Sequence, residues 1–273
     1  MENTYWHQQK NTEPLFADII WSRPEQRAAA GKLAIFGGNV HGFNGVSSAY
    51  DAANKARVGS IRVLLPDSLR KTLAKLWPEC EFAPSNKSGG FSSRALDNWL
   101  ELSTGWADAT LICGDLGLNS ETDILLEQFL EKESGYISLC GDSINLLIGT
   151  SQSVLDRSNI LLAADSGQLQ RLASAIRFPG AFKSTLTLLQ AVEFLHRLTA
   201  AYSFAVVTIF ESNIIIADDG QISTTKIPPT SINQPWPLID LATACAVWQL
   251  QQPNKTFAAL SSAAFMQVHP SYN

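Results

Sequence analysis

The 273-residue sequence is poor in cysteine, in charge and in long apolar runs. It has four cysteines, and charged residues make up 16% of it. Cys80, Cys113, Cys140 and Cys245 lie far apart and form no Cys-x-x-Cys pair, which argues against a disulfide scaffold or a zinc site. No apolar run approaches the ~18 residues that a membrane-spanning helix needs. The N-terminus also lacks a basic segment followed by an apolar one, so we expect no secretory signal and a cytoplasmic protein.

Positive charge is scarce as well. The formal net charge is −5, which argues against general nucleic-acid binding because that needs a basic surface. The composition does not argue against binding of small anionic ligands, since local backbone dipoles can hold them. The four histidines show no ligand spacing, and we identify no metal site in the sequence. Hydrophobic residues reach 45%, which is enough for a large core and disfavours disorder.

Apolar, non-alternating segments alternate with helical segments along most of the chain. This pattern predicts a largely parallel central sheet covered by helices on both faces. We predict one such domain over residues 31–273, and a lead-in over residues 1–30 that combines a short helix with an extended segment and packs on it. The predicted strands are 33–36, 60–65, 109–113, 136–140, 159–162, 205–210 and 213–217. The predicted helices are 46–57, 69–76, 96–103, 121–132, 167–176, 186–202, 238–251 and 256–268.

Ligands of such sheets bind beyond the carboxyl ends of the strands. That rule gathers the most distinctive loops of the sequence at one edge. They are residues 37–45, 66–67, 114–117, 141–143, 163–167 and 235–240.

The first of these loops is rich in glycine and lies between a strand and a helix. Gly37, Gly38, Gly42 and Gly45 fall within nine residues, in a spacing that is neither a Walker A motif nor Gly-x-Gly-x-x-Gly. Glycine lets backbone N–H groups approach a ligand, and the following helix start favours an anion. We therefore predict ligand binding here, because four glycines exceed what tight packing, the alternative explanation, needs.

Carboxylates stand at several of the predicted strand ends. Asp115 and Asp142 each lie beside a glycine, where they could hold Mg²⁺ through water, orient a ribose or act as bases. The alternative is an ordinary Asx turn. Asp240 opens a helix and is either a general base or only an N-cap. Asp67 stands where a dinucleotide-binding fold places its ribose-binding acid.

At these loops the sequence resembles the ADP- or ATP-dependent NAD(P)H-hydrate dehydratases of the ribokinase-like group. Residues 32–45 resemble the opening strand and glycine-rich loop of that family, and 112–117 resemble its Gly-Pro-Gly-Leu-Gly stretch. Residues 139–147 resemble its Asp-Ala-Asp-Ala-Leu-Asn, and 162–172 fall where it has Thr-Pro-His-Pro-Gly-Glu. The likeness covers roughly residues 30–265 and implies a ribokinase-like three-layer α/β/α fold with a mainly parallel central sheet.

The resemblance also implies an activity and a set of site residues. A family member phosphorylates hydrated NAD(P)H with ADP or ATP and Mg²⁺, and loss of the phosphate restores the cofactor, which makes it a carbon–oxygen lyase of metabolite repair. Asp240 would be the base, and a homo-oligomer is expected. The dinucleotide side would be formed by Gly38, Asn39, His41, Phe43, Asn44, Gly45, Gly117 and Asp142. The nucleotide side would be formed by Asp165 and Gly167. Lys183, near a predicted helix start, is a further candidate for a phosphate contact, and the alternative is a solvated lysine.

One departure from the family pattern bears on catalysis. The family has Gly-Ser/Thr-Gly-Asp before its last site helix, and here residues 237–240 read Pro-Leu-Ile-Asp. The glycines expose N–H groups to the transferred phosphate, whereas Pro237 has no N–H. We therefore expect weak or no turnover. Two alternatives stay open, a catalytically inactive nucleotide-binding or assembly module of this fold, and a Rossmann-type NAD-dependent dehydrogenase with Asp67 on the ribose.

Overall fold

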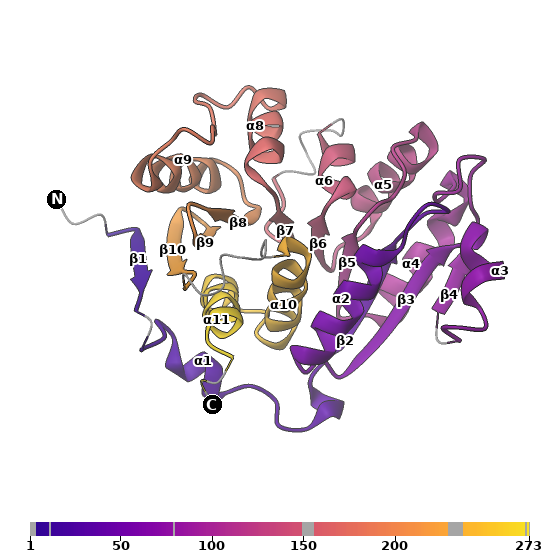
Figure 1. Cartoon of the computed structure of the whole chain (residues 1–273), viewed down its shortest axis with the longest axis horizontal. Helices are drawn as coiled ribbons and strands as arrows, with labels where there is room; N and C mark the ends of the chain where they lie inside the picture. Colours follow the sequence, from indigo (N-terminus) through magenta and orange to yellow (C-terminus); the bar gives the residue numbers. More distant parts are fainter. Residues whose placement is uncertain are drawn as a thin grey trace.

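The computed structural model describes residues 4–10, 12–78, 80–148, 156–228, 237–270 and 272. A ten-stranded sheet runs through it in the order β1-β10-β9-β8-β7-β6-β5-β2-β3-β4 (Figure 1). Its strands are β1 (Trp6–Gln9), β2 (Lys32–Gly37), β3 (Ser60–Pro66), β4 (Cys80–Ala83), β5 (Ala109–Cys113), β6 (Tyr136–Cys140), β7 (Ile160–Ala163), β8 (Ala205–Phe210), β9 (Asn213–Asp218) and β10 (Gln221–Lys226). Among these, β9 alone runs antiparallel to its neighbours, so the prediction of a mainly parallel sheet is confirmed.

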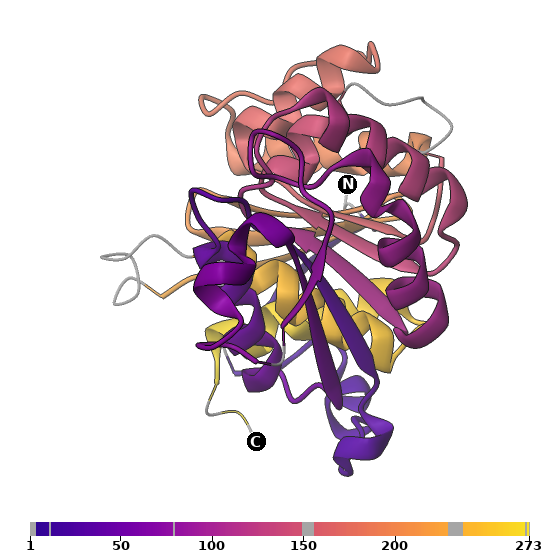
Figure 2. The ribbon, with the colours of Figure 1, turned by 90° about the vertical axis from the view of Figure 1, so that its right-hand side faces the viewer.

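Helices cover both faces of the sheet. They are α1 (Ala17–Trp21), α2 (Asn44–Lys55), α3 (Arg70–Leu73), α4 (Leu96–Trp106), α5 (Ser120–Lys132), α6 (Asp142–Leu147), α8 (Ser166–Ala175), α9 (Leu188–Ala201), α10 (Leu238–Gln251) and α11 (Thr256–Val268). One apolar core lies between the sheet and α2, α10 and α11, and the other lies between the sheet and α4, α5, α8 and α9 (Figure 2). Both faces of the central strands are therefore buried, which explains why their sequences do not alternate.

The sequence analysis missed three strands and overestimated one helix. The edge strands β1 and β4 are four residues each, too short to give a periodic signal. β10 reads Gln-Ile-Ser-Thr-Thr-Lys and looks polar, yet its four central residues are buried. The helix predicted at 69–76 is a 3₁₀ turn followed by the short α3.

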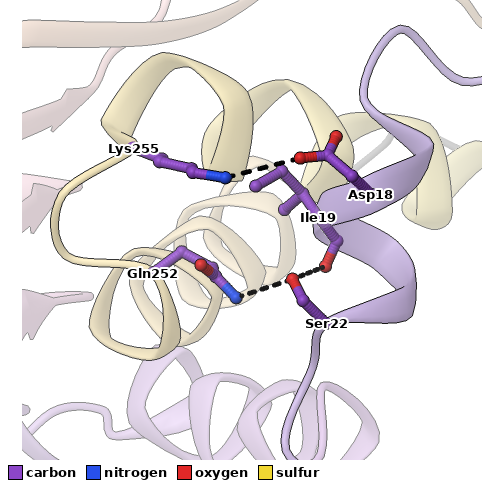
Figure 3. Close-up of polar contacts among 5 residues, drawn as sticks. All are labelled: Asp18, Ile19, Ser22, Gln252 and Lys255. Carbon is purple, nitrogen blue, oxygen red and sulfur yellow. Dashed lines mark hydrogen bonds and ion pairs between the residues drawn. The ribbon is translucent and has the colours of Figure 1, made fainter.

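The N-terminal lead-in adds a strand to the sheet and a helix to one face. β1 pairs in parallel with β10, and α1 lies against the connection between α10 and α11. Figure 3 shows two polar contacts that fix α1: Lys255 Nζ lies 3.4 Å from Asp18 Oδ2, and Gln252 Nε2 donates to Ser22 Oγ at 3.1 Å. The chain after α1 is thereby held beside α10.

The described helices and the cysteine side chains bear on two expectations from the composition. No helix in the described ranges is long and apolar enough to cross a bilayer. Cys80, Cys113, Cys140 and Cys245 are all buried. Burial raises the pKa of Cys140 to about 12 and that of Cys113 well above its usual value, so these thiols stay protonated and unreactive at neutral pH.

The hairpin turn between β9 and β10 brings a carboxyl to the first turn of α11. Asp218 accepts a hydrogen bond from the Phe257 backbone N–H, but burial, and then the charge of Asp219, raise its pKa from 3.8 to about 6. The folded chain therefore binds more protons than the unfolded chain between about pH 4 and about pH 6. Stability contributed by the protonated group should be lost as the pH rises through this window.

We expect Asp218→Asn to raise the free energy of unfolding at pH 7 by about 1–2 kcal/mol, less than the full shift implies because the side chain is partly exposed. Asparagine keeps an acceptor for Phe257 and carries no charge to desolvate. Urea unfolding at pH 4 and pH 7 measures the effect, and the variant should match the wild-type protein at the lower pH. An equal slope with pH in both proteins would contradict this assignment.

Candidate functional site

The glycine-rich loop is held in shape by its own backbone and by one buried asparagine. Asn39 and Gly42 exchange two backbone hydrogen bonds, at 3.0 and 3.1 Å. The Asn39 side chain is 2% exposed, and its Oδ1 accepts the backbone N–H of His41 at 2.7 Å. The loop then enters α2 at Asn44, with Phe43 at the N-cap position. Asn39 and His41 thus lie in one preorganised turn at the end of β2.

Most of the glycines in this loop have a structural reason. A Cβ on Gly37 would lie 2.1 Å from Cys113 O, and one on Gly45 would lie 2.7 Å from Gly114 Cα. Gly38 has a φ of +82°, which favours glycine. Only Gly42 has open space where a Cβ would be. Packing therefore accounts for more of the glycine content than the sequence analysis allowed, and the glycines alone are a weaker argument for a ligand.

The two carboxylates at the ends of β5 and β6 are neighbours. Asp142 Oδ2 accepts the backbone N–H of Leu116 at 3.1 Å, and Asp115 Oδ1 accepts that of Gly117 at 2.9 Å. The carboxyls of Asp115 and Asp142 also hydrogen-bond each other, and the Asn39 side chain donates to Asp115. The structure thus brings together Asn39, Asp115, Gly117 and Asp142, which the sequence placed on separate loops.

The environment of the pair shifts the pKa values of the two carboxyls in opposite directions. Burial raises the pKa of Asp142, and the adjacent Asp115 raises it further. The hydrogen bond from the Leu116 N–H lowers this pKa but does not outweigh the other two effects. Burial acts in the same direction on Asp115, but hydrogen bonds from Asn39 and Gly117 outweigh it, and the pKa of Asp115 falls below its usual value. Of the two carboxyls, Asp142 therefore holds a proton more readily, and Asp115 is the more readily ionised.

A second pair of polar side chains extends the site toward α8. Asn145, one turn after Asp142 on α6, donates to the Asp142 carboxyl. Asn145 Oδ1 accepts from Arg171 Nη2 at 2.7 Å, and Gln168 Nε2 donates to Gly141 O at 2.8 Å. We call Asn39, Asp115, Asp142, Asn145 and Arg171 the carboxyl-edge cluster. The sequence analysis did not select Asn145 or Arg171. The three-residue spacing from Asp142 on a helix is the signal that would have found Asn145.

Asp240 lies elsewhere on α10. Its side chain lines a cavity between α2, α10 and α11, and its charged neighbours are Lys55 and Asp51 of α2. Oδ1 is buried and has no hydrogen-bond partner in the described part of the chain. Burial raises the pKa of Asp240, and Asp51 raises it further although Lys55 lowers it. No contact found in the described residues joins Asp240 to Asp115 or Asp142.

The first turn of α10 is occupied by its own backbone and side chains. The N–H groups of Asp240 and Leu241 both point to Pro237 O, at 3.1 and 3.4 Å. Ile239 Cδ1 lies 3.1 Å from the position of a Cβ on Gly45, so this side chain packs at the start of α2. Residues 235 and 236, which the sequence placed on the same edge, lie outside the described residues.

The remaining predicted residues have local roles. Asp165 is the N-cap of α8, where its Oδ1 accepts the Gln168 N–H at 2.8 Å within a capping box. Gly167 lies in the first turn of that helix, and the Lys183 side chain is exposed. Asp67 Oδ1 accepts the backbone N–H of Ser85 at 3.0 Å and is also bonded by the Ser85 hydroxyl. Asp67 thus has local partners in place of the ribose that a Rossmann-type enzyme would offer it.

A metal site does not form around these carboxylates. Within the described ranges, no group of three or more His, Cys, Asp or Glu side chains could hold a metal ion. Asp115 and Asp142 together offer only two carboxylate ligands. A divalent cation at this edge would need oxygens from a ligand or from water to complete its shell.

Solved structures resemble this chain over almost its whole length. A hypothetical protein from Streptococcus mutans matches with a TM-score of 0.73 and 16% identity, over 96% of this chain and 88% of that one. A ribokinase-like superfamily protein from Enterococcus faecalis matches with a TM-score of 0.70 and 15% identity, over 98% and 88%. This chain has the ribokinase-like fold.

A third structure with the same fold is that of an enzyme. The ADP/ATP-dependent NAD(P)H-hydrate dehydratase from Bacillus subtilis, co-crystallised with ATP/Mg²⁺, matches with a TM-score of 0.65 and 11% identity, over 94% of this chain and 87% of that one. No protein-family model matches the sequence, and no curated protein does. The ribokinase-like fold predicted from the sequence is therefore confirmed by structure alone.

Proposed function

We propose that this chain binds a dinucleotide of the NAD(P)H-hydrate class at the carboxyl-edge cluster and transfers phosphate weakly or not at all. The observation that carries the proposal is the separation of two groups of residues. Asp115 and Asp142 lie together at the ends of β5 and β6. Asp240 instead lines the cavity between α2, α10 and α11, which no residue of the carboxyl-edge cluster lines. Binding groups are retained at the sheet edge, and the group that resemblance assigns as the base is not among them.

The first turn of α10 fits a transferred phosphate poorly. An anion there needs free N–H groups, but those of Asp240 and Leu241 bond to Pro237 O, and Pro237 has none of its own. The Ile239 side chain adds bulk beside Gly45. Loss of a single donor to a developing charge can cost about 3 kcal/mol in the barrier, so turnover should fall by orders of magnitude.

The carboxyl-edge cluster supplies complementary groups for a nucleotide-like molecule. The Asp115 carboxylate, whose pKa is lowered, can accept hydrogen bonds from ribose hydroxyls, and the Asp142 carboxyl lies beside it as a second polar group. The exposed Arg171 offers a planar guanidinium for a phosphate group. The open space beside Gly42 permits close approach of a ligand to the backbone. Together these groups suit a ligand that carries both hydroxyls and phosphate.

A thermal-shift panel of AMP, ADP, ATP, NAD, NADH and hydrated NADH tests the proposal. We expect the dinucleotides to stabilise the chain, by about 2.7 kcal/mol at one hundred times the dissociation constant. Asp142→Asn should weaken dinucleotide binding about fivefold, because asparagine replaces one carboxyl oxygen by an N–H₂ group and an ordinary hydrogen bond is worth about 0.5–1.5 kcal/mol. Asp97→Asn, at an exposed position on α4, is the control and should leave binding unchanged.

Recovery of NADH from its hydrate in the presence of ADP or ATP tests the catalytic half. We expect dinucleotide binding with little or no recovery. Robust recovery that is abolished by Asp240→Asn would instead identify an active dehydratase, the other reading of the resemblance. No thermal shift with any ligand of the panel would remove the binding half of the proposal. A homo-oligomer stays a prediction, which the molar mass in solution can test.

A further inference from the structure

A cavity of about 320 Å³ lies between α2, α10, α11 and the segment that follows α1. The charged side chains that line it are Arg23, Lys55, Arg57 and Asp240, and Trp248 forms part of its wall. Its volume equals that of roughly ten water molecules at ~30 Å³ each. The cavity is distinct from the carboxyl-edge cluster, because none of the cluster residues lines it.

Arg23 is fixed at one side of this cavity. Its Nε donates to Gln251 Oε1 at 2.9 Å, Nη2 donates to Ala56 O, and the guanidinium lies 4.1 Å from the centre of the Trp248 ring. The docking of α1 on the α10–α11 connection holds the chain that carries Arg23 (Figure 3). A planar cation held in this way is preorganised to bind an oxyanion.

The positive charge around Arg23 is not neutralised. Arg57 lies close enough that burial and the charge of Arg57 together lower the pKa of Arg23 to about 10. Across the described residues, the ion pairs within 4.0 Å are Arg62–Glu81 and Lys255–Asp18, so neither arginine has a carboxylate partner. Two adjacent cations that lack a counter-ion are a place where an anion is favoured.

The same cavity contains an acceptor without a donor. Asp240 Oδ1 is buried and unpartnered in the described part of the chain. A buried polar atom without a partner is unfavourable, and a ligand hydroxyl that donates to it would remove that penalty. The charged groups at the cavity and beside it are Arg23, Lys55 and Arg57 against Asp51 and Asp240, which leaves one net positive charge for an anion.

We propose that this cavity is a second ligand site, which binds a small hydroxylated oxyanion. Its phosphate or carboxylate group lies between Arg23 and Arg57, and one of its hydroxyls donates to Asp240 Oδ1. The proposal does not rest on the dinucleotide site, since it uses other residues and another face of the molecule. It also gives Asp240 a role in binding that is independent of phosphate transfer.

Isothermal titration calorimetry of the full chain tests this site with glycerol 3-phosphate, glycerate and inorganic phosphate as probes. We expect saturable one-to-one binding of a hydroxylated probe, tighter than that of inorganic phosphate. Whichever of glycerol 3-phosphate and glycerate binds more tightly shows whether the site prefers a phosphate or a carboxylate group. Absence of saturable binding of every probe at tens of millimolar would overturn the proposal.

A pair of matched variants locates the binding. Arg57 has a φ of +60° and Arg177, at the end of α8, has a φ of +54°, so asparagine suits both backbones. Arg57→Asn should weaken binding of the probe about tenfold or more, in line with a charged hydrogen bond of about 1.5–3 kcal/mol. Arg177→Asn removes the same charge away from the cavity and should leave the affinity within about twofold. Equal affinities for the two variants would contradict the site.

The two ligand sites can be told apart with the same proteins. Arg57→Asn should keep the dinucleotide thermal shift, and Asp142→Asn should keep the binding of glycerol 3-phosphate. Loss of dinucleotide binding alone would leave the cavity proposal standing. Loss of both in Arg57→Asn would show that the probe binds at the sheet edge and would overturn the second site.

Discussion

Replacing Gly37 by alanine is expected to lower the free energy of unfolding by about 3 kcal/mol, at the upper end of the usual cost of overpacking. Gly37 pairs with Cys113 of β5, and a Cβ there would lie 2.1 Å from the Cys113 carbonyl oxygen and 2.8 Å from Val46 Cγ2. Both neighbours are rigid, since one is the backbone of a central strand and the other is a β-branched residue of α2. The strand or the helix must move.

The same loop contains the control for this experiment. Nothing lies within 4 Å of a Cβ on Gly42, so Gly42→Ala should leave the free energy of unfolding within about 0.5 kcal/mol of the wild-type value, or raise it slightly. Urea denaturation of both variants measures the contrast. Similar stabilities for the two variants would mean that β5 and α2 yield easily, and the packing explanation for Gly37 would be wrong.

The central strands could be predicted from the sequence because both of their faces are buried. The longer helices could be predicted because each buries one broad apolar face. The strand predicted at 109–113 and the helix predicted at 238–251 match β5 and α10 residue for residue. The same rule failed for β10, whose buried residues are mostly serine and threonine. The Asp219-Gly220 turn before it, with both φ angles positive, is the hairpin signal that would have indicated this strand.

The site was predictable as an edge of the sheet but not as a set of contacts. Asp115 and Asp142 could be placed together, because parallel strands end on one side. Their partners could not, because Asn39 reaches Asp115 across a loop and Arg171 reaches Asn145 from another helix. Asp240 illustrates the limit most clearly. Its position at the start of α10 was predicted, whereas the direction of its side chain depends on the packing of α2 and α11, which no local pattern encodes.

Replacing Trp99 by alanine should have the largest effect of any single substitution considered, a loss of about 3–5 kcal/mol in the free energy of unfolding. The Trp99 side chain of α4 is fully buried. Its ring centre lies 4.9 Å from that of Phe36, 5.1 Å from that of Phe91 and 5.3 Å from that of Phe129. The three remaining aromatic rings, Phe36, Phe91 and Phe129, come from three segments and cannot close around the space that alanine would leave, so the cavity term adds to the lost burial.

Two further variants separate the cavity from other causes. Trp99 Nε1 has no hydrogen-bond partner among the described residues, so Trp99→Phe removes an unsatisfied donor along with some volume. We expect Trp99→Phe to cost about 1–2 kcal/mol, well below the alanine variant. Trp21→Ala, at a side chain that is 74% exposed, should cost less than about 0.5 kcal/mol.

Urea unfolding followed by circular dichroism gives the free energies of unfolding of the three variants, and it does not depend on tryptophan fluorescence. The loss of packing in Trp99→Ala should also disturb the carboxyl edge of the sheet, because Phe36 immediately precedes Gly37 at the end of β2. The dinucleotide thermal shift of this variant should therefore be smaller than that of Trp21→Ala. A Trp99→Ala protein within about 1 kcal/mol of the wild type would show that the four-ring cluster repacks, contrary to the close packing of protein interiors.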